Sequence, residues 1–295
     1  MAANFSVINN IGALNALNRL QTSNAGLSKT LEKLSSGLRI NSASDDASGL
    51  AIADGLRADV AALNQAVRNA NDGISVVEVA DGVLGEVSNL LQRAVSLAEQ
   101  AASDTSGEDS GSEKAAINSE YQAILREVNR LSLTVDFNGR ELFGTTGATF
   151  DVQVGASETS ANNVITLTTS ALQSTGSATG GLGLTASSGT GISVQTTALN
   201  TKAGAQAELD LVRAAIDEIA SRRGDLGAVR NRLQNTINVV STQAQTLTAA
   251  ESQIRDADLA SEIVQLTKFQ VLNQTGLSAL AQANANSQSV LALLR

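Results

Sequence analysis

Residues 208–254 read ELDLVRAAIDEIASRRGDLGAVRNRLQNTINVVSTQAQTLTAAESQI, and their apolar side chains repeat every seven positions. One heptad register is filled without a break by Val212, Ile219, Leu226, Leu233, Val240, Leu247 and Ile254. The companion register holds Leu209, Ile216 and Ile237 but also Arg223 and Arg230. At about 1.5 Å per residue, this pattern predicts a single helix about 70 Å long that packs along a partner helix.

The N-terminal part of the chain shows the same spacing in two runs separated by a turn-rich segment. The first run consists of Leu17, Leu20, Leu27, Leu31, Leu34 and Leu38. Residues 40–49, INSASDDASG, then offer Ser42, Ser44, Asp45 and Asp46 as caps for a new helix. The heptad spacing resumes over residues 56–98, where Asp81 and Ser88 interrupt it. A second apolar strip on this run predicts contact with two partner helices.

Two further helices and a different kind of segment complete the chain. Residues 115–133 predict a shorter helix, and the last helix carries Leu259, Ile263, Leu266, Leu277, Leu280, Leu291 and Leu294, with Gln270, Asn273 and Asn284 expected in its seam. More than half of residues 144–204 are Gly, Ser or Thr, and residues 149–154, 163–168 and 192–196 alternate like short strands. The predicted fold class is therefore mainly α: a long antiparallel helical coiled-coil rod with a small β-rich insert at about 144–204.

The composition excludes several classes of function. The chain contains no Cys, His, Pro or Trp, so imidazole or thiolate metal sites and His-dependent nucleophilic sites cannot form. Its lysines belong to no catalytic motif. We therefore expect no enzyme, no catalytic residues, no metal site and no cofactor. A net charge of −9 disfavours nucleic acid as a partner. No apolar run of 18 residues exists, so no membrane span is expected.

Both ends of the chain lack charge, although both carry apolar stripes. No charged residue occurs in residues 1–18 or 269–294. A solvated helix normally has charges opposite its apolar stripe, so these helices are expected to meet protein around most of their circumference. Such surfaces favour heterologous contacts that generate rings or open helical filaments. A long intramolecular bundle without a polymer is the alternative that periodicity alone leaves open.

Several motifs in order resemble those of bacterial flagellins. Residues 34–53, LSSGLRINSASDDASGLAIA, are similar to the signature of that family, and residues 273–295, NQTGLSALAQANANSQSVLALLR, resemble its C-terminus. FNGRELF at residues 137–143, GDLGAVRNRL at 224–233 and IRDADLASE at 254–262 are similar to flagellin segments in the same order. The resemblance covers about residues 1–143 and 205–295.

The resemblance implies a structural subunit that self-assembles as a helical homopolymer into the extracellular flagellar filament used for motility. It implies type III export without a cleaved signal peptide, with an export chaperone, cap and hook-junction proteins as partners. Residues 1–41 and 256–295 would form an inner coiled-coil domain, and residues 42–255 a core domain without a sizeable outer domain. The implied assembly residues are Leu17, Leu20, Leu27, Leu31, Leu34, Leu277, Leu280, Leu291 and Leu294. A hook-filament junction protein and an adhesive filament subunit are the alternatives.

The resemblance also implies a contact patch for the flagellin-sensing Toll-like receptor. Gln92, Arg93 and Leu97 match its helical motif, and Glu120 lies at the matching place on the next helix. Ser96 stands where a Glu is common, which removes a charge and would weaken this contact. A solvated or inter-subunit charge pair between Arg93 and Glu120 is the alternative.

Overall fold

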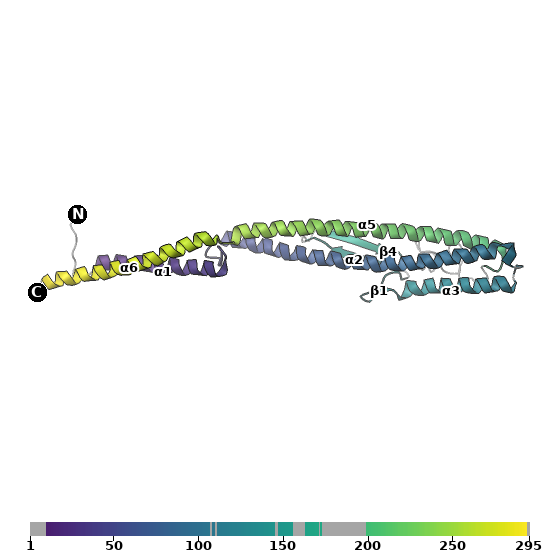
Figure 1. Cartoon of the computed structure of the whole chain (residues 1–295), viewed down its shortest axis with the longest axis horizontal. Helices are drawn as coiled ribbons and strands as arrows, with labels where there is room; N and C mark the ends of the chain where they lie inside the picture. The colour runs from purple at the N-terminus through teal and green to yellow at the C-terminus, as the bar shows by residue number, and fades with distance from the viewer. Residues whose placement is uncertain are drawn as a thin grey trace. The chain divides into compact units, whose positions relative to one another are not determined.

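The computed structural model describes residues 10–106, 108, 109, 111–144, 147–155, 163–170, 172 and 199–293. Within them, the predicted fold class is confirmed: long antiparallel helices dominate, and a small β-rich insert separates them (Figure 1). The helices are α1 (Ile11–Ser36), α2 (Ala47–Ala102), α3 (Ser112–Thr134), α5 (Lys202–Arg255) and α6 (Leu259–Leu293), with a 3-10 turn η1 at Asp104–Ser106.

Helix α5 confirms the long helix predicted from the heptad repeat. Five of the seven positions of its first register are buried, namely Val212, Ile219, Leu226, Leu233 and Val240. Leu247 and Ile254 are half-buried. The apolar stripe therefore provides most of the helix's stability through packing, since propensity alone supports isolated helices poorly.

Helix α2 packs against two partners, as its two apolar strips predicted. Both strips contribute to one buried core cluster. The first strip contributes Val77, Leu84 and Leu91, and the second contributes Val76 and Val87. That cluster also includes residues of α3 and α5, and Figure 1 shows α2 running between these two helices. The predicted helix at 115–133 is confirmed as α3.

Two small antiparallel hairpins occur in the described residues, one within the insert and a shorter one just before it. Strands β3 (Ala148–Gln153) and β4 (Val164–Thr169) pair from Ala148↔Thr169 to Gln153↔Val164, which confirms two of the three predicted strands. The third, at 192–196, lies outside the described residues. The shorter hairpin, β1 (Asp136–Phe137) and β2 (Arg140–Glu141), joined by Asn138 and Gly139, was not predicted from the sequence.

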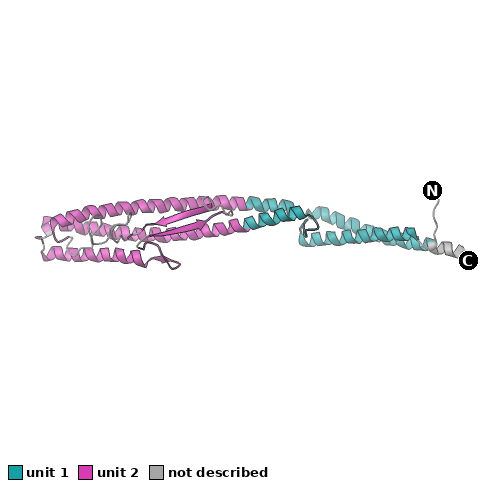
Figure 2. Ribbon diagram, turned by 180° about the vertical axis from the view of Figure 1, so that it is seen from behind, with its two compact units in different colours: residues 1–60, 245–295 teal, residues 61–244 magenta. Residues whose placement is uncertain are grey.

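The chain divides into two compact units (Figure 2). Unit 1 contains residues 1–60 and 245–295, and so includes α1 and α6. Unit 2 contains residues 61–244, with α3, both hairpins and most of α2 and α5. The predicted inner-domain segments, 1–41 and 256–295, remain a prediction.

Candidate assembly surface

Helices α1 and α6 pair antiparallel in unit 1 along a seam of small, polar and a few large residues. The α1 side consists of Ala13, Ala16, Leu20, Ser23, Leu27, Thr30 and Leu34, and the α6 side of Glu262, Leu266, Phe269, Asn273, Gly276, Leu280 and Ala283. Asn10 is the N-cap of α1, because its Oδ1 accepts the Ala13 N–H. Its Nδ2 donates to the Ala283 carbonyl of α6 at 3.0 Å. At the other end, Lys33 Nζ lies 3.7 Å from Glu262 Oε1.

The centre of this seam depends on close approach between the helices. A Cβ atom on Gly26 would lie 2.5 Å from the Phe269 ring, and one on Gly276 would lie 3.2 Å from Leu20. Ser23 Oγ donates to the Phe269 carbonyl at 3.4 Å. One amide oxygen, Asn273 Oδ1, is buried here without a hydrogen-bond donor. The seam thus holds the helices in one register but buries little large apolar surface.

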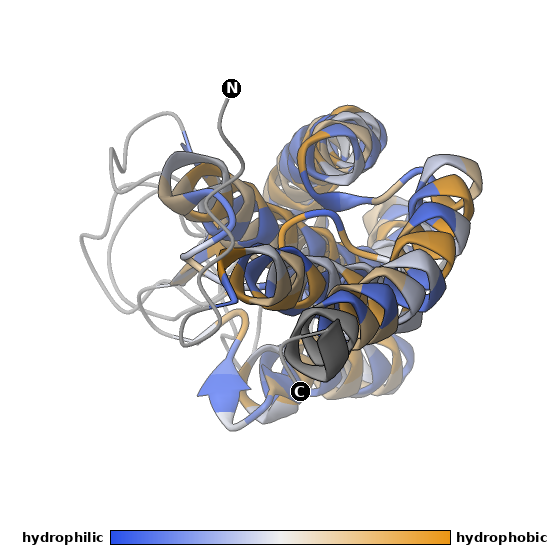
Figure 3. Cartoon of the chain, turned by 90° about the vertical axis from the view of Figure 1, so that its left-hand side faces the viewer, coloured by the Kyte–Doolittle hydropathy of each residue, from blue (hydrophilic) through white to orange (hydrophobic). Residues whose placement is uncertain are grey.

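Many other large apolar residues of α1 and α6 lie outside this seam and are exposed. Those more than one third exposed on the two helices are Ile11, Leu14, Leu17, Leu31, Leu259, Ile263, Val264, Val271, Leu272 and Leu277. The hydropathy colouring in Figure 3 shows hydrophobic segments on several sides of the helices. Large apolar side chains exposed in this number on two helices are typical of a protein interaction site.

The predicted assembly leucines fall into two groups. Leu20, Leu27, Leu34 and Leu280 are half-buried in the seam within the chain. Leu17, Leu31 and Leu277 are 39%, 47% and 57% exposed, and so are available to another molecule. The Leu291 side chain and Leu294 lie outside the described residues. Of the amides expected in the seam, Asn273 lies there, whereas Gln270 and Asn284 are exposed.

The seam ends at paired helix breaks. Gly37 terminates α1 at φ 72°, where a side chain would be strained, and donates to the Lys33 carbonyl. The segment after α1 then pairs with the break between α5 and α6: Arg39 N–H donates to the Arg255 carbonyl, and Ala257 N–H to the Gly37 carbonyl. This short bridge lies where α1 ends and α6 begins.

The acidic pair after this bridge has two separate structural roles. Asp46 Oδ1 accepts the Gly49 N–H at 2.9 Å and so caps α2. Asp45 Oδ2 accepts the N–H groups of Asn41 and Ser42, while its Oδ1 lies 2.7 Å from Lys29 Nζ. The hydrogen bond from Lys29, followed by those from the backbone, lowers the pKa of Asp45 to about 2.

The Asp45 contacts are expected to weaken only in strong acid. Because the pKa is lowered on folding, the carboxylate contributes stability above its unfolded pKa of about 3.9, and this contribution is lost as pH falls through about 2. An NMR titration of the Asp45 carboxyl carbon should give a midpoint near 2, and Asp45→Asn should increase amide exchange at Ser42. A midpoint near 4 would contradict this assignment.

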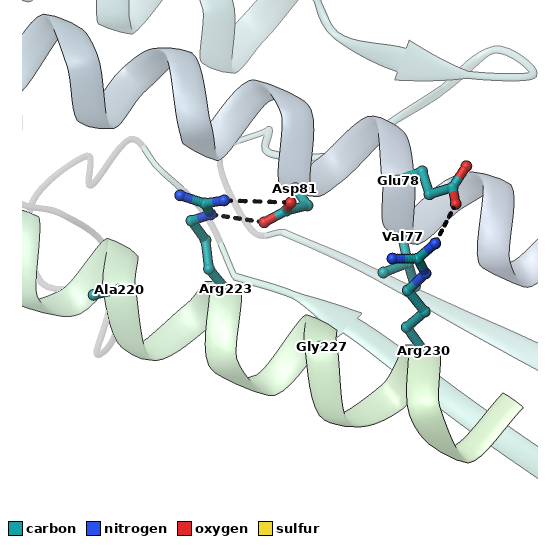
Figure 4. Close-up of a pocket in the computed structure, with 7 residues that line it drawn as sticks. All are labelled: Val77, Glu78, Asp81, Ala220, Arg223, Gly227 and Arg230. Atoms are coloured by element: carbon teal, nitrogen blue, oxygen red, sulfur yellow. Dashed lines mark hydrogen bonds and ion pairs between the residues drawn. The ribbon is translucent and has the colours of Figure 1, made fainter. Parts of the chain in front are cut away.

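Unit 2 carries a groove of about 340 Å³ between α2 and α5 (Figure 4). Two ion pairs span it: Arg223 Nε lies 2.7 Å from Asp81 Oδ1, and Arg230 Nη2 lies 2.9 Å from Glu78 Oε1. The polar interruptions of the two heptad patterns, Asp81 and Arg223, therefore face each other. These side chains hold the register between α2 and α5, and no group of three or more potential metal ligands occurs among the described residues.

The four predicted receptor residues lie together on α2 and α3, but they are not equally accessible. Arg93 Nη2 lies 2.7 Å from Glu120 Oε1, and both side chains are about half exposed. Gln92 is exposed and donates to Ser88 Oγ at 3.4 Å. Leu97 is only 2% exposed, because it belongs to the hydrophobic core of unit 2.

A buried polar pair links α3 to α5 in unit 2. Tyr121 is fully buried, and its hydroxyl donates to Glu208 Oε2 at 2.9 Å. Burial raises the pKa of Glu208. Burial, together with the nearby Glu208 carboxylate, also raises the pKa of Tyr121. Both groups thus hold their protons more tightly in the folded chain than in the unfolded chain.

Unit 2 is therefore expected to lose stability at alkaline pH. A raised tyrosine pKa contributes stability below about pH 10, and that contribution is lost as pH rises through the folded value. Since Tyr121 is the only tyrosine, ultraviolet difference spectroscopy reports its ionisation directly. We expect it to ionise above pH 10 and together with loss of helicity. A midpoint at 10 in the folded chain would contradict the buried pair.

Comparison with known proteins agrees with this architecture. The family profile of the bacterial flagellin N-terminal helical region matches residues 7–148, and that of the C-terminal helical region matches residues 209–294. The chain belongs to the bacterial flagellin family. It is 38% identical to a flagellin of Bacillus subtilis (strain 168), over 97% of this chain and 98% of that protein. It is 37% identical to the flagellar filament 33 kDa core protein of Treponema phagedenis, again over 97% and 98%.

A solved structure gives a further likeness in fold. A flagellar hook-associated protein of Vibrio parahaemolyticus superposes with a TM-score of 0.54 and 15% identity, over 72% of this flagellin and 100% of that chain. That likeness shows the fold alone, whereas the identity to flagellins extends along nearly the whole sequence. The comparisons therefore favour flagellin over the junction protein that the sequence analysis kept as an alternative. Among the described residues, no helix has the length and hydropathy needed to cross a bilayer.

Proposed function

We propose that this flagellin is the repeating structural subunit of a bacterial flagellar filament, and that unit 1 carries its main assembly surface. The observation that carries this proposal is the set of large apolar residues outside the seam: α1 and α6 bury Ser23 and Thr30 between them but leave Leu31 and Leu277 exposed. Burying a large aliphatic side chain contributes about 1.5–3 kcal/mol. Leu31 and Leu277 therefore offer association energy that the single chain does not use.

The absence of charge along these helices supports the same surface. Residues 269–286 contain no charged side chain, so burying this part of α6 between copies requires no desolvation of an ion. The exposed positions lie on several faces of each helix, which suits contacts with more than one neighbour. Heterologous contacts of this kind extend into an open helical polymer rather than closing a dimer.

The proposal is tested with the purified full-length chain by electron microscopy after addition of ammonium sulfate, which strengthens apolar burial. Wild type should form uniform helical filaments. The variant Leu31→Lys/Leu277→Lys should keep the circular dichroism spectrum of the wild-type monomer, because both side chains are exposed. It should form no filaments. The matched variant Leu31→Met/Leu277→Met should still assemble. Filaments from the lysine variant, or none from wild type, would overturn the proposal.

Membership of the family supports further proposals about location and partners. We propose an extracellular filament that is exported without a cleaved signal peptide, with an export chaperone, cap and hook-junction proteins as partners, and a structural rather than enzymatic role. We also propose that Gln92, Arg93 and Glu120 carry contact with the flagellin-sensing Toll-like receptor, because Leu97 is buried. Arg93→Ala should then weaken receptor activation by soluble monomer, whereas Arg68→Ala, also on an exposed part of α2, should not.

A further inference from the structure

One heptad position on each helix of unit 1 alternates between a large apolar residue and an amide. The members of this alternating stripe are Leu17, Asn24 and Leu31 on α1, and Ile263, Gln270, Leu277 and Asn284 on α6. Successive members are seven residues apart, so like residues recur every fourteen, or about 21 Å along a helix. All seven side chains are exposed, and none lies in the α1–α6 seam.

The amides of the alternating stripe have no hydrogen-bond partner among the described residues. In the part that the structure describes, the side chains of Asn24, Gln270 and Asn284 make no hydrogen bond. Other amides of the same unit do, as Asn10 does with the Ala283 carbonyl. An amide that interrupts an exposed apolar stripe at a fixed interval removes apolar surface, and no hydrogen bond within the described part of the chain compensates for this loss.

A second copy of this chain is the partner that this pattern fits. The stripe has the same spacing on α1 and on α6, so either helix of one copy matches either helix of another in spacing and in residue type. The stripe is also continuous with the exposed apolar residues assigned above to assembly. No charge interrupts residues 269–286, as an interface buried between identical copies requires.

We propose that the alternating stripe sets the axial register between neighbouring copies, with apolar positions packed against apolar positions and amides hydrogen-bonded to amides. The proposal rests on the proposed filament function. Sliding one copy by a heptad, about 10.5 Å, would bury each amide against an aliphatic side chain without a partner, which is unfavourable. Single polar residues in otherwise apolar heptads fix register in coiled coils in the same way.

The test exchanges the two residue kinds at all seven positions and asks which filaments the variant extends. The exchanged chain carries Leu17→Asn, Asn24→Leu, Leu31→Asn, Ile263→Gln, Gln270→Ile, Leu277→Asn and Asn284→Leu. Its alternation is shifted by half a period on both helices, so copies of it still match each other. The rate at which the exchanged chain extends its own seeds should be within about threefold of the rate at which wild type extends wild-type seeds. The exchanged chain should extend wild-type seeds at least tenfold more slowly than it extends its own.

A matched control exchanges residues one heptad apart at other exposed positions of the same helices, outside the exposed apolar residues assigned to assembly: Asn18→Ala, Ala25→Asn, Thr275→Gln and Gln282→Thr. This chain should extend wild-type seeds like wild type. Three outcomes would overturn the register proposal while wild type still assembles. The exchanged chain could extend both kinds of seed equally, it could fail to extend its own seeds, or the control could be as defective as the exchanged chain. Failure of wild type to assemble would instead overturn the filament function itself.

Discussion

Replacing Asp109 by alanine is expected to destabilise unit 2, and so to lower the urea concentration at its unfolding midpoint. Asp109 Oδ1 lies 2.7 Å from the Nζ atom of Lys114, whose side chain is only 2% exposed. The same oxygen accepts the Lys202 N–H, and Lys202 Nζ lies 2.8 Å from Asp104. Removing the carboxylate would leave a buried ammonium without its anion and would release the loop from the start of α5.

Two variants separate this effect from general damage to the fold. Asp109→Ala/Lys114→Met should recover most of the lost stability, because it also removes the buried ammonium. Arg93→Ala, which breaks the exposed pair with Glu120, should shift the unfolding midpoint less than Asp109→Ala does. Urea unfolding followed by circular dichroism measures all three. An unfolding midpoint of Asp109→Ala equal to that of wild type would show that Lys114 does not depend on Asp109.

Gly26→Ala is expected to destabilise the pairing of α1 with α6 by about 2 kcal/mol. A Cβ atom at this position would lie 2.5 Å from Cζ and 2.6 Å from Cε1 of Phe269. The ring is rigid and half-buried in the seam, so relief requires the two helices to separate. This cost exceeds the gain of about 1 kcal/mol that alanine normally gives over glycine inside a helix.

The matched control is Gly55→Ala in α2, where a Cβ atom would meet nothing within 4 Å. That variant should gain about 0.5–1 kcal/mol. Native-state hydrogen exchange of the α1 amides reports the pairing, and exchange should increase in Gly26→Ala. Adding Phe269→Leu should restore much of the protection by removing the ring. If Gly26→Ala protected α1 as well as wild type, the close approach assigned to this seam would be wrong.

The bounds of the long helices could be predicted from the sequence because burial requires apolar residues at helical spacing. The unbroken register from Val212 to Ile254 is compatible only with one continuous helix, and α5 is such a helix. Which side chains of α2 are exposed was predicted less accurately. Leu97 continues the second apolar strip of α2, seven residues after Leu90, so the pattern itself predicts that Leu97 is buried. The assignment of Leu97 to the receptor patch did not take this pattern into account.

The orientation of α1 and α6 could not be predicted from heptad spacing alone. An apolar stripe normally marks the seam of a pair, yet here Ser23 and Thr30 are buried while Leu17 and Leu31 are exposed. The reason lies in the partner helix: the Phe269 ring occupies the space over Gly26, so the face with Ser23, Gly26 and Thr30 lies against α6, whereas Leu17 and Leu31 lie outside it. Heptads identify positions that will be buried by some helix, but not which helix buries them.

The hairpin of β1 and β2 was missed for a different reason. Asn138 and Gly139 adopt φ values of 51° and 76°, the left-handed conformations of a tight two-residue turn for which this dipeptide is the usual signal. Each flanking strand is only two residues long, so no alternation was visible beside the turn. The opposed Asp81 and Arg223 were likewise uninterpretable until the register between α2 and α5 was known.

Thiol labelling gives the most direct test of the central claim that the exposed apolar face of unit 1 becomes buried between copies. The chain has no cysteine, so Leu277→Cys introduces a single reporter at a position that is 57% exposed. Ser23→Cys, at a position 7% exposed in the seam, is the matched control. The Leu277→Cys thiol should be alkylated quickly in the monomer and at least tenfold more slowly in filaments, whereas the Ser23→Cys thiol should react slowly in both. Equal rates for Leu277→Cys in monomer and filament would contradict the account.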